Sequence, residues 1–165
     1  MLETERLVLR NMNKEDAEEI FRIWGNPRVN KYLWDSLYKN VEDIRNMLPD
    51  SNSDSDYSFV IIRKDTENII GTCGIGSEGL EDEWGFGYCL EPEAWGNGYA
   101  TELLQALIRL AQENGIKTIV GEAAIENPQS IKVMEKNGLK FHHNSVFTKA
   151  DGSATFESKI YKMVL

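Results

Sequence analysis

The connection at residues 95–102 (WGNGYATE) constrains this chain most, because it joins a predicted strand to the strongest helical pattern in the sequence. An apolar run at 84–90 precedes it, and leucines and alanines at helical core spacing follow it. Gly96 and Gly98 leave backbone N–H groups uncovered by side chains where the helix begins. These groups lie at the positive end of the helix dipole, where a phosphate can bind. The sequence therefore predicts a strand–turn–helix unit with a phosphate site at its turn.

The rest of the chain alternates strand patterns with amphipathic helix patterns, which predicts an α+β domain. Asn13 with Asp16, and Asn40 with Asp43, are typical N-cap pairs at helix starts. We see no repeat or linker, so residues 1–165 are interpreted as a single domain. Strands are predicted at 7–12, 57–63, 69–75, 84–90, 118–125, 141–148 and 155–165, and helices at 13–24, 40–49, 100–114 and 127–137.

The charge of the chain argues against a nucleic-acid partner. It has 27 acidic and 18 basic residues, for a formal net charge of −9 at pH 7. No basic cluster is concentrated enough to neutralise the phosphates of a nucleic acid. The acidity suits a cationic small molecule or a basic protein tail, although keeping the protein in solution is the simpler explanation.

The cysteines and histidines predict neither a disulfide framework nor a metal site. Cys73 and Cys89 form no CxxC pair, and we expect two reduced thiols. His142 and His143 are neighbours on a predicted strand, so we expect them to face opposite ways and to form no ligand pair. The N-terminus is no signal peptide and no apolar run approaches spanning length, which predicts a cytoplasmic protein without a membrane partner.

Several segments, in the right order, resemble the GNAT superfamily of acyl-CoA N-acyltransferases, and together they extend from about residue 3 to the end of the chain. They are GYCL at 87–90, WGNGYATE at 95–102, NPQS at 127–130 and VMEKNG at 133–138. The opening ETERLVLR at 3–10, with NPRV at 26–29, is similar to the ribosomal-protein N-acetyltransferase branch of that superfamily. A lone GxG motif is weak, but the ordered set is specific.

The resemblance implies a fold and a co-substrate. The fold is a mixed, mostly antiparallel sheet of about seven strands, flanked by about four helices and splayed at its centre. The co-substrate is acetyl-CoA, whose pantetheine arm lies between the splayed strands, and no metal is implied. The implied contacts to acetyl-CoA are the backbone of Cys89 and Leu90, the pyrophosphate-binding turn of Gly96, Asn97, Gly98, Tyr99, Ala100 and Thr101, and Asn127 on the pantetheine arm.

The catalytic residues depart from the family's pattern. Many relatives carry a tyrosine, thought to protonate the leaving thiolate, where this chain has Met134; Ser130 is the nearest hydroxyl on the same predicted helix, and we assign that role to it. The glutamate that relatives often carry on the splayed strand corresponds to Gly85. Glu83, acting through water, and Glu122 are the candidate bases, and for each a solvated surface carboxylate is the competing interpretation.

The resemblance places the acceptor beside the irregular segment 28–39. Tyr32 and Trp34 are predicted to line the acceptor site, with anchoring of this loop as the alternative. The predicted reaction is direct attack of a primary amine on the acetyl thioester in a ternary complex. A protein N-terminal amine is the favoured acceptor, and a polyamine, an amino acid or an aminoglycoside stays open. A non-catalytic acyl-CoA sensor is the second hypothesis, and the protein is expected to be a monomer or homodimer.

Overall fold

A computed structural model describes residues 1–50 and 57–165. Within those ranges the chain forms eight strands, five α-helices and two short 3-10 helices. The strands are β1 (Leu2–Glu3), β2 (Leu7–Asn11), β3 (Ser58–Arg63), β4 (Ile69–Ser77), β5 (Glu83–Leu90), β6 (Thr118–Ala124), β7 (Lys140–Thr148) and β8 (Thr155–Val164). The helices are η1 (Lys14–Asp16), α1 (Ala17–Trp24), α2 (Pro27–Asn30), α3 (Val41–Met47), η2 (Pro92–Ala94), α4 (Tyr99–Glu113) and α5 (Pro128–Lys136).

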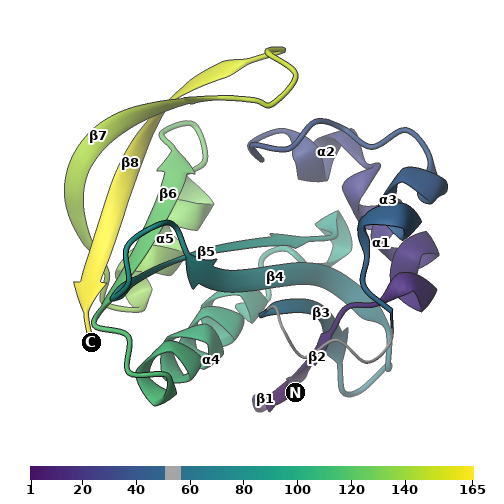
Figure 1. Ribbon diagram of the computed structural model, residues 1–165, viewed down its shortest axis with the longest axis horizontal. Coiled ribbons are helices and arrows are strands. Elements are labelled where there is room, and N and C mark those ends of the chain that lie inside the picture. The colour runs from purple at the N-terminus through teal and green to yellow at the C-terminus, as the bar shows by residue number, and fades with distance from the viewer. Residues whose placement is uncertain (51–56) are drawn as a thin grey trace. The chain divides into compact units, whose positions relative to one another are not determined.

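The strands form one mixed sheet in the order β1-β2-β3-β4-β5-β6-β8-β7 (Figure 1). The pairs β1–β2, β2–β3, β3–β4, β6–β8 and β7–β8 are antiparallel, and β5–β6 is parallel. The predicted α+β fold with a mostly antiparallel sheet is confirmed. The two elements beyond the predicted count are the two-residue β1 and the single turn α2, which are too short to produce a periodic pattern.

Contacts divide the chain into two compact units, and we describe each by itself. Unit 1 comprises Met1–Lys31, Leu37–Gly74 and Tyr88–Tyr99. One of its core clusters joins α1 and α3, which lie beside one another in Figure 1, to β3. The buried members of this cluster are Ala17, Ile20, Ile44, Leu48 and Val60. The helices bury these residues because each has an apolar face at 3.6-residue spacing.

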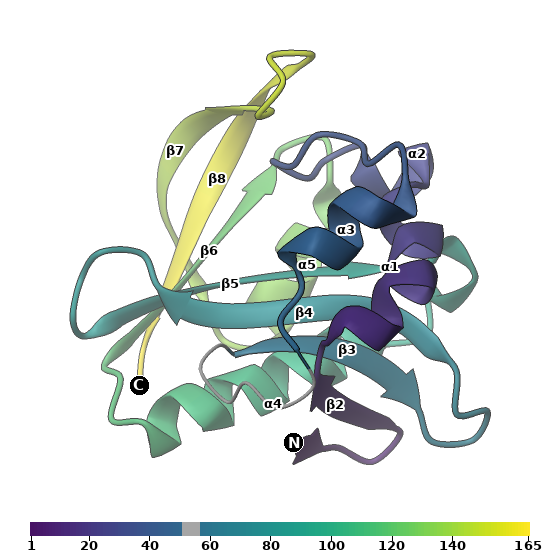
Figure 2. The same cartoon turned by 45° about the vertical axis from the view of Figure 1, so that its right-hand side comes forward.

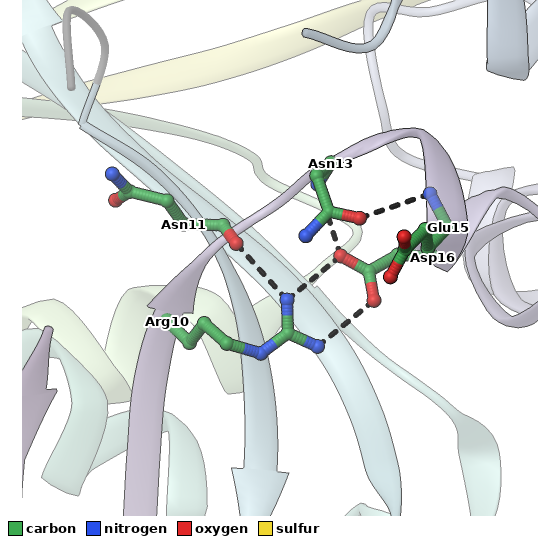
Figure 3. Close-up of polar contacts among 5 residues, drawn as sticks. All are labelled: Arg10, Asn11, Asn13, Glu15 and Asp16. Carbon is green, nitrogen blue, oxygen red and sulfur yellow. Dashed lines mark hydrogen bonds and ion pairs between the residues drawn. The ribbon is translucent and has the colours of Figure 1, made fainter. Parts of the chain in front are cut away.

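A capping box holds the start of the first helical segment, as the sequence predicts. The Asn13 side chain accepts a hydrogen bond from the Glu15 N–H at 2.9 Å, and Asp16 Oδ2 accepts one from the Asn13 N–H at 2.9 Å. Arg10 donates to both Asp16 carboxylate oxygens, at 2.8 and 2.9 Å, and to the Asn11 carbonyl (Figure 3). The Asp16 residue is only 6% exposed, and these hydrogen bonds supply the partners that a buried carboxylate needs.

Unit 2 comprises Tyr32–Ser36, Ile75–Gly87 and Ala100–Leu165. Figure 2 shows β7 and β8 as a long hairpin beside β6, with α5 next to β6. Phe86 and Met134 pack closely over Gly121 of β6. This requires a glycine, because a Cβ at residue 121 would lie 2.6 Å from the Phe86 ring and 2.7 Å from the Met134 sulfur. The predicted helical core spacing of α4 is confirmed by Leu103, Leu104, Leu107 and Ala111, all fully buried.

The histidine pair corrects a prediction. His142 and His143 do not face opposite ways: their Nδ1 atoms lie 2.7 Å apart and their ring centroids 5.0 Å apart. The register of β7 against β8 shifts between Phe141 and His143, so His142 is an extra residue in the strand. Such a bulge breaks the two-residue alternation on which the prediction depended.

Candidate functional site

The glycine turn has the backbone conformation that its sequence requires. Gly96 and Gly98 have φ of +74° and +80°, in the left-handed region that side chains rarely adopt. Helix α4 begins at the next residue, Tyr99. The Asn97 side chain shapes the loop by donating to the carbonyls of Ala94 and Trp95, at 3.1 and 3.0 Å. A Cβ on Gly96 would meet no heavy atom within 4 Å, so open space adjoins the turn.

Two arginines from unit 1 lie against this turn, and the sequence interpretation did not single them out. Arg6 donates to the Asn97 carbonyl at 2.9 Å, and its guanidinium stacks on the Tyr99 ring at 4.5 Å. Arg63, which is ion-paired with Asp65, lies over the same ring at 5.7 Å, so that Arg6 is the main source of added charge. Positive charge therefore adds to the helix dipole at this point. Arg6 is visible in the opening TERL sequence, but no local pattern predicts that its side chain contacts residue 97.

The backbones of Cys89 and Leu90 face opposite edges of β5. The Cys89 carbonyl oxygen lies 2.2 Å from where a Cβ on Gly71 would stand, and the Glu91 N–H donates to the Ile70 carbonyl at 2.8 Å. Residues 89 and 91 thus direct their backbone groups towards β4, and Leu90 directs its own away from β4.

Trp95 is tied to the same strand. Its indole N–H donates to the Leu90 carbonyl at 2.8 Å, and Arg28 lies over its ring at 5.2 Å. A carbonyl oxygen has two lone pairs, so Leu90 retains one acceptor position and its N–H donor. The tryptophan therefore holds the end of β5 in place.

The parallel ladder between β5 and β6 is short. It pairs Glu83 with Thr118, Trp84 with Ile119 and Gly85 with Val120, which is the last pair of this ladder among the described residues. Both strands continue, β5 to Leu90 and β6 to Ala124. Just beyond the last pair, Phe86 and Met134 pack over Gly121 on one face of unit 2. Within unit 2, the paired part of β5 and β6 thus ends at Gly85.

Asn127 and Ser130 meet at the start of α5. Asn127 is the N-cap residue, and its Nδ2 donates to the Ser130 hydroxyl oxygen at 3.1 Å. A serine hydroxyl carries one O–H donor besides the oxygen lone pairs that accept this bond. Met134, one turn further along α5, is 2% exposed and offers only a thioether. Ser130 is therefore the residue of this pair with a proton to donate.

The two candidate carboxylates already have partners. Lys162 donates to Glu83 at 2.8 Å, and Ser158 donates to Glu122 at 2.6 Å. Glu83 is paired with Thr118 at the start of β6, whereas Ser130 follows the end of that strand at Ala124. The six residue steps from Thr118 to Ala124 separate the two ends of β6 by roughly 20 Å. The structure does not bring Glu83 and Ser130 together.

The segment Tyr32–Ser36 is anchored in unit 2 by its backbone and by one ring. Lys149, only 7% exposed, donates from Nζ to the Leu33 carbonyl at 2.5 Å, and the Ala150 N–H donates to the Trp34 carbonyl at 2.8 Å. The Tyr32 ring makes an edge contact with Phe156, at 5.5 Å between centroids. Trp34 itself is 60% exposed. Tyr32 therefore anchors this segment, and Trp34 presents an aromatic surface to solvent.

No cluster of three or more metal-binding side chains occurs in the described parts of the chain. None of the helices within residues 1–50 and 57–165 is long and apolar enough to cross a membrane. Both cysteines are buried free thiols.

Comparison with known proteins decides the family. The model of the acetyltransferase (GNAT) domain matches residues 6–140. This chain belongs to the GNAT acetyltransferase family. An uncharacterized N-acetyltransferase, p20, from Bacillus licheniformis is 35% identical over 162 residues, which cover 92% of this chain and 89% of the relative. The GNAT match therefore spans the glycine turn, β5, β6 and α5.

Solved GNAT structures share the fold. An acetyltransferase of the GNAT family from Bacillus anthracis superposes with a TM-score of 0.85 at 23% identity, covering 99% of this chain and 97% of that one. The spermidine N-acetyltransferase of Vibrio cholerae, in complex with CoA and spermine, has a TM-score of 0.79 at 20% identity, with 96% and 95% covered. The GNAT membership predicted from the sequence is confirmed, while these relatives do not single out the ribosomal-protein branch.

Proposed function

We propose that this GNAT domain transfers the acetyl group of acetyl-CoA to a primary amine of a cationic acceptor. The observation that carries the proposal is the turn at Gly96 and Gly98, whose two left-handed glycines open the 15-residue helix α4 with its N–H groups uncovered. Such a helix start binds phosphate through backbone donors and the helix dipole. Cys73 and Cys89 are buried free thiols, which is consistent with a cytoplasmic location.

The residues of the turn have distinct proposed roles towards the co-substrate. The backbone N–H groups of residues 96–101 bind the pyrophosphate, and Ala100 and Thr101 are small enough to let it approach. Arg6 holds the turn through the Asn97 carbonyl and adds positive charge. The Leu90 backbone pairs with an amide of the pantetheine arm, since it faces away from β4. Asn127 contacts the same arm.

The proposed chemistry is direct attack on the thioester. A primary amine with a pKa near 10 is mostly protonated at neutral pH, so a carboxylate has to accept its proton first. The neutral nitrogen then attacks the acetyl carbonyl carbon, backbone N–H groups stabilise the oxyanion, and the C–S bond breaks. Ser130 donates a proton to the leaving thiolate or contacts its sulfur.

A cationic acceptor is favoured by the side chains of unit 2. Glu122, whose carboxylate accepts from the neutral Ser158 hydroxyl, and the exposed ring of Trp34 offer negative charge and a π face, both of which attract an ammonium group. The Vibrio cholerae relative acts on spermidine, which is consistent with such a substrate. A protein N-terminal amine is an alternative acceptor that the same assay distinguishes.

The test is thiol release from acetyl-CoA with a panel of amines. The panel contains spermidine, an aminoglycoside, lysine and short peptides with free N-termini, and mass spectrometry locates the added acetyl group. We expect CoA to bind and at least one cationic amine to be acetylated. Acetylation of peptides alone would redirect the proposal to a protein N-terminal amine. Tight CoA binding without transfer to any amine would refute it and support the acyl-CoA sensor.

A further inference from the structure

Glu78 lies over Gly85 in unit 2, in the place that a side chain at residue 85 would occupy. A Cβ on Gly85 would lie 2.2 Å from Glu78 Oε1, 2.4 Å from its Cδ and 2.9 Å from its Cγ. The carboxyl group of Glu78 therefore lies where the side chain of a residue 85 other than glycine would begin, within a carboxyl group's reach of β5.

The turn between β4 and β5 holds Glu78 in this position. Ser77 Oγ donates to the Leu80 carbonyl at 3.1 Å and accepts from the Gly79 N–H at 3.2 Å. Gly79 has φ of +105°, which reverses the chain directly after Glu78. The turn thus folds residue 78 back over β5, and the missing side chain of Gly85 leaves space for its carboxylate.

The face of β5 beneath this carboxylate is open further along the strand. Gly87 shares the face with Gly85, because side chains alternate, and a Cβ on Gly87 would meet no heavy atom within 4 Å. The β5–β6 ladder also ends at Gly85. A carboxylate, the end of the β5–β6 ladder and an open glycine surface therefore lie together within unit 2.

Three neighbouring carboxylates are already engaged. Glu83 binds Lys162, and Glu122 accepts from Ser158. On the adjoining turn, Asp82 binds Lys117. Within the described residues, no ion pair or side-chain hydrogen bond involves Glu78. It is thus the carboxylate on this face whose oxygens compete least with a neighbouring donor when an ammonium group approaches.

We propose that Glu78 is the catalytic base of this protein, supplying from the β4–β5 turn the carboxylate that β5 lacks at Gly85. The proposal rests on the proposed acetyl transfer. The acceptor R–NH₃⁺ gives one proton to the Glu78 carboxylate and becomes R–NH₂. Its lone pair forms the C–N bond at the acetyl carbon, the C–S bond breaks, and the sulfur keeps that electron pair. The new amide nitrogen loses a proton, the thiolate sulfur takes one up, and CoA departs as the thiol.

The first test compares Glu78→Gln with Glu81→Gln, which removes the same charge from the same turn. Each protein is assayed by thiol release with the panel amine that the wild type acetylates fastest. At pH 7.5 about one primary amine in a thousand is neutral, so loss of the base should lower kcat/KM about 100-fold in Glu78→Gln. The deficit should shrink as the pH approaches 10, where neutral amine is abundant without a base. Glu81→Gln should follow the wild-type pH profile.

The second test moves the carboxylate to the strand. Glu78→Ala should lower kcat/KM as much as Glu78→Gln does. The double variant Glu78→Ala/Gly85→Glu should have a kcat/KM at least tenfold higher than Glu78→Ala. The reason is that a glutamate side chain at residue 85 would start from the space that the Glu78 carboxyl group occupies, and would carry a carboxylate to the same part of β5. Thermal unfolding of every variant shows whether it is folded, and Glu78→Gln keeps shape and size at an exposed position.

The outcomes separate this proposal from the one on which it rests. If the wild type binds CoA but acetylates no amine, both proposals fail. If the wild type is active and Glu78→Gln matches Glu81→Gln at every pH, acetyl transfer stands and Glu78 is not the base. A loss in Glu78→Gln that is equal at all pH values also overturns the proposal, because it indicates a structural role.

Discussion

Gly96→Ala is the sharpest test of the phosphate-binding turn. Gly96 has φ of +74°, and an added Cβ meets no heavy atom within 4 Å. The folding cost is therefore limited to holding a non-glycine residue in the left-handed region, about 1–2 kcal/mol. For a chain of 165 residues, that lowers Tm by about 2–8 °C. We expect a folded protein with a modestly reduced melting temperature.

The effect on CoA binding should be larger than the effect on stability. The new methyl group occupies the open space beside the N–H groups that we propose to bind phosphate. Losing one hydrogen bond to a charged group costs about 1.5–3 kcal/mol, which corresponds to a Kd for CoA about 10- to 150-fold higher. Isothermal titration of the folded variant with CoA measures this change directly.

Gly115→Ala is a matched control for this experiment. Gly115 has φ of +73° and, like Gly96, nothing within 4 Å of an added Cβ. It follows the end of α4 rather than its start. Both substitutions should cost similar stability, and only Gly96→Ala should weaken CoA binding. Equal CoA affinities in the two variants would refute the assignment of the turn.

Three further predictions follow from side-chain contacts. Arg6→Ala removes the bond to the Asn97 carbonyl and the charge stacked on Tyr99, so titration should show about tenfold weaker CoA binding in a folded protein; unchanged affinity would exclude Arg6 from the site. Asp16→Ala leaves Arg10 without its partner and should lower the free energy of unfolding in urea by about 2–4 kcal/mol, whereas a loss below about 1 kcal/mol would contradict this account. Burial raises the pKa of the Cys73 thiol far above its ordinary value. The unfolded chain then ionises first, so stability should fall above about pH 8.5, by up to about 1.4 kcal/mol per pH unit, and Cys73→Ala should reduce that slope.

Much of the fold could be predicted because its signals are local. The Asn13–Asp16 capping box, the Asn40 N-cap and the glycines of the turn all act within a few residues, and each adopts the expected geometry. The elements that were missed, β1 and α2, span two and four residues. Hydrophobic periodicity cannot be read over so few positions.

The histidine pair shows where a local rule fails. Alternation along a strand holds only while the ladder is regular, and the bulge in β7 places both rings on one side. The same limit applies to Cys89 and Leu90. Their orientation depends on which residues of β5 hydrogen-bond to β4, and a register is a property of two strands rather than one.

The sequence by itself determined the strand–turn–helix unit, its two obligatory glycines and membership of the GNAT family, because short-range conformational demands and ordered motifs carry that information. Only the tertiary structure brought Arg6 to the Asn97 carbonyl and Glu78 over Gly85. Both contacts depend on how the chain turns between strands. A glycine in a sequence shows that space exists at its position, and only the fold shows which side chain occupies that space.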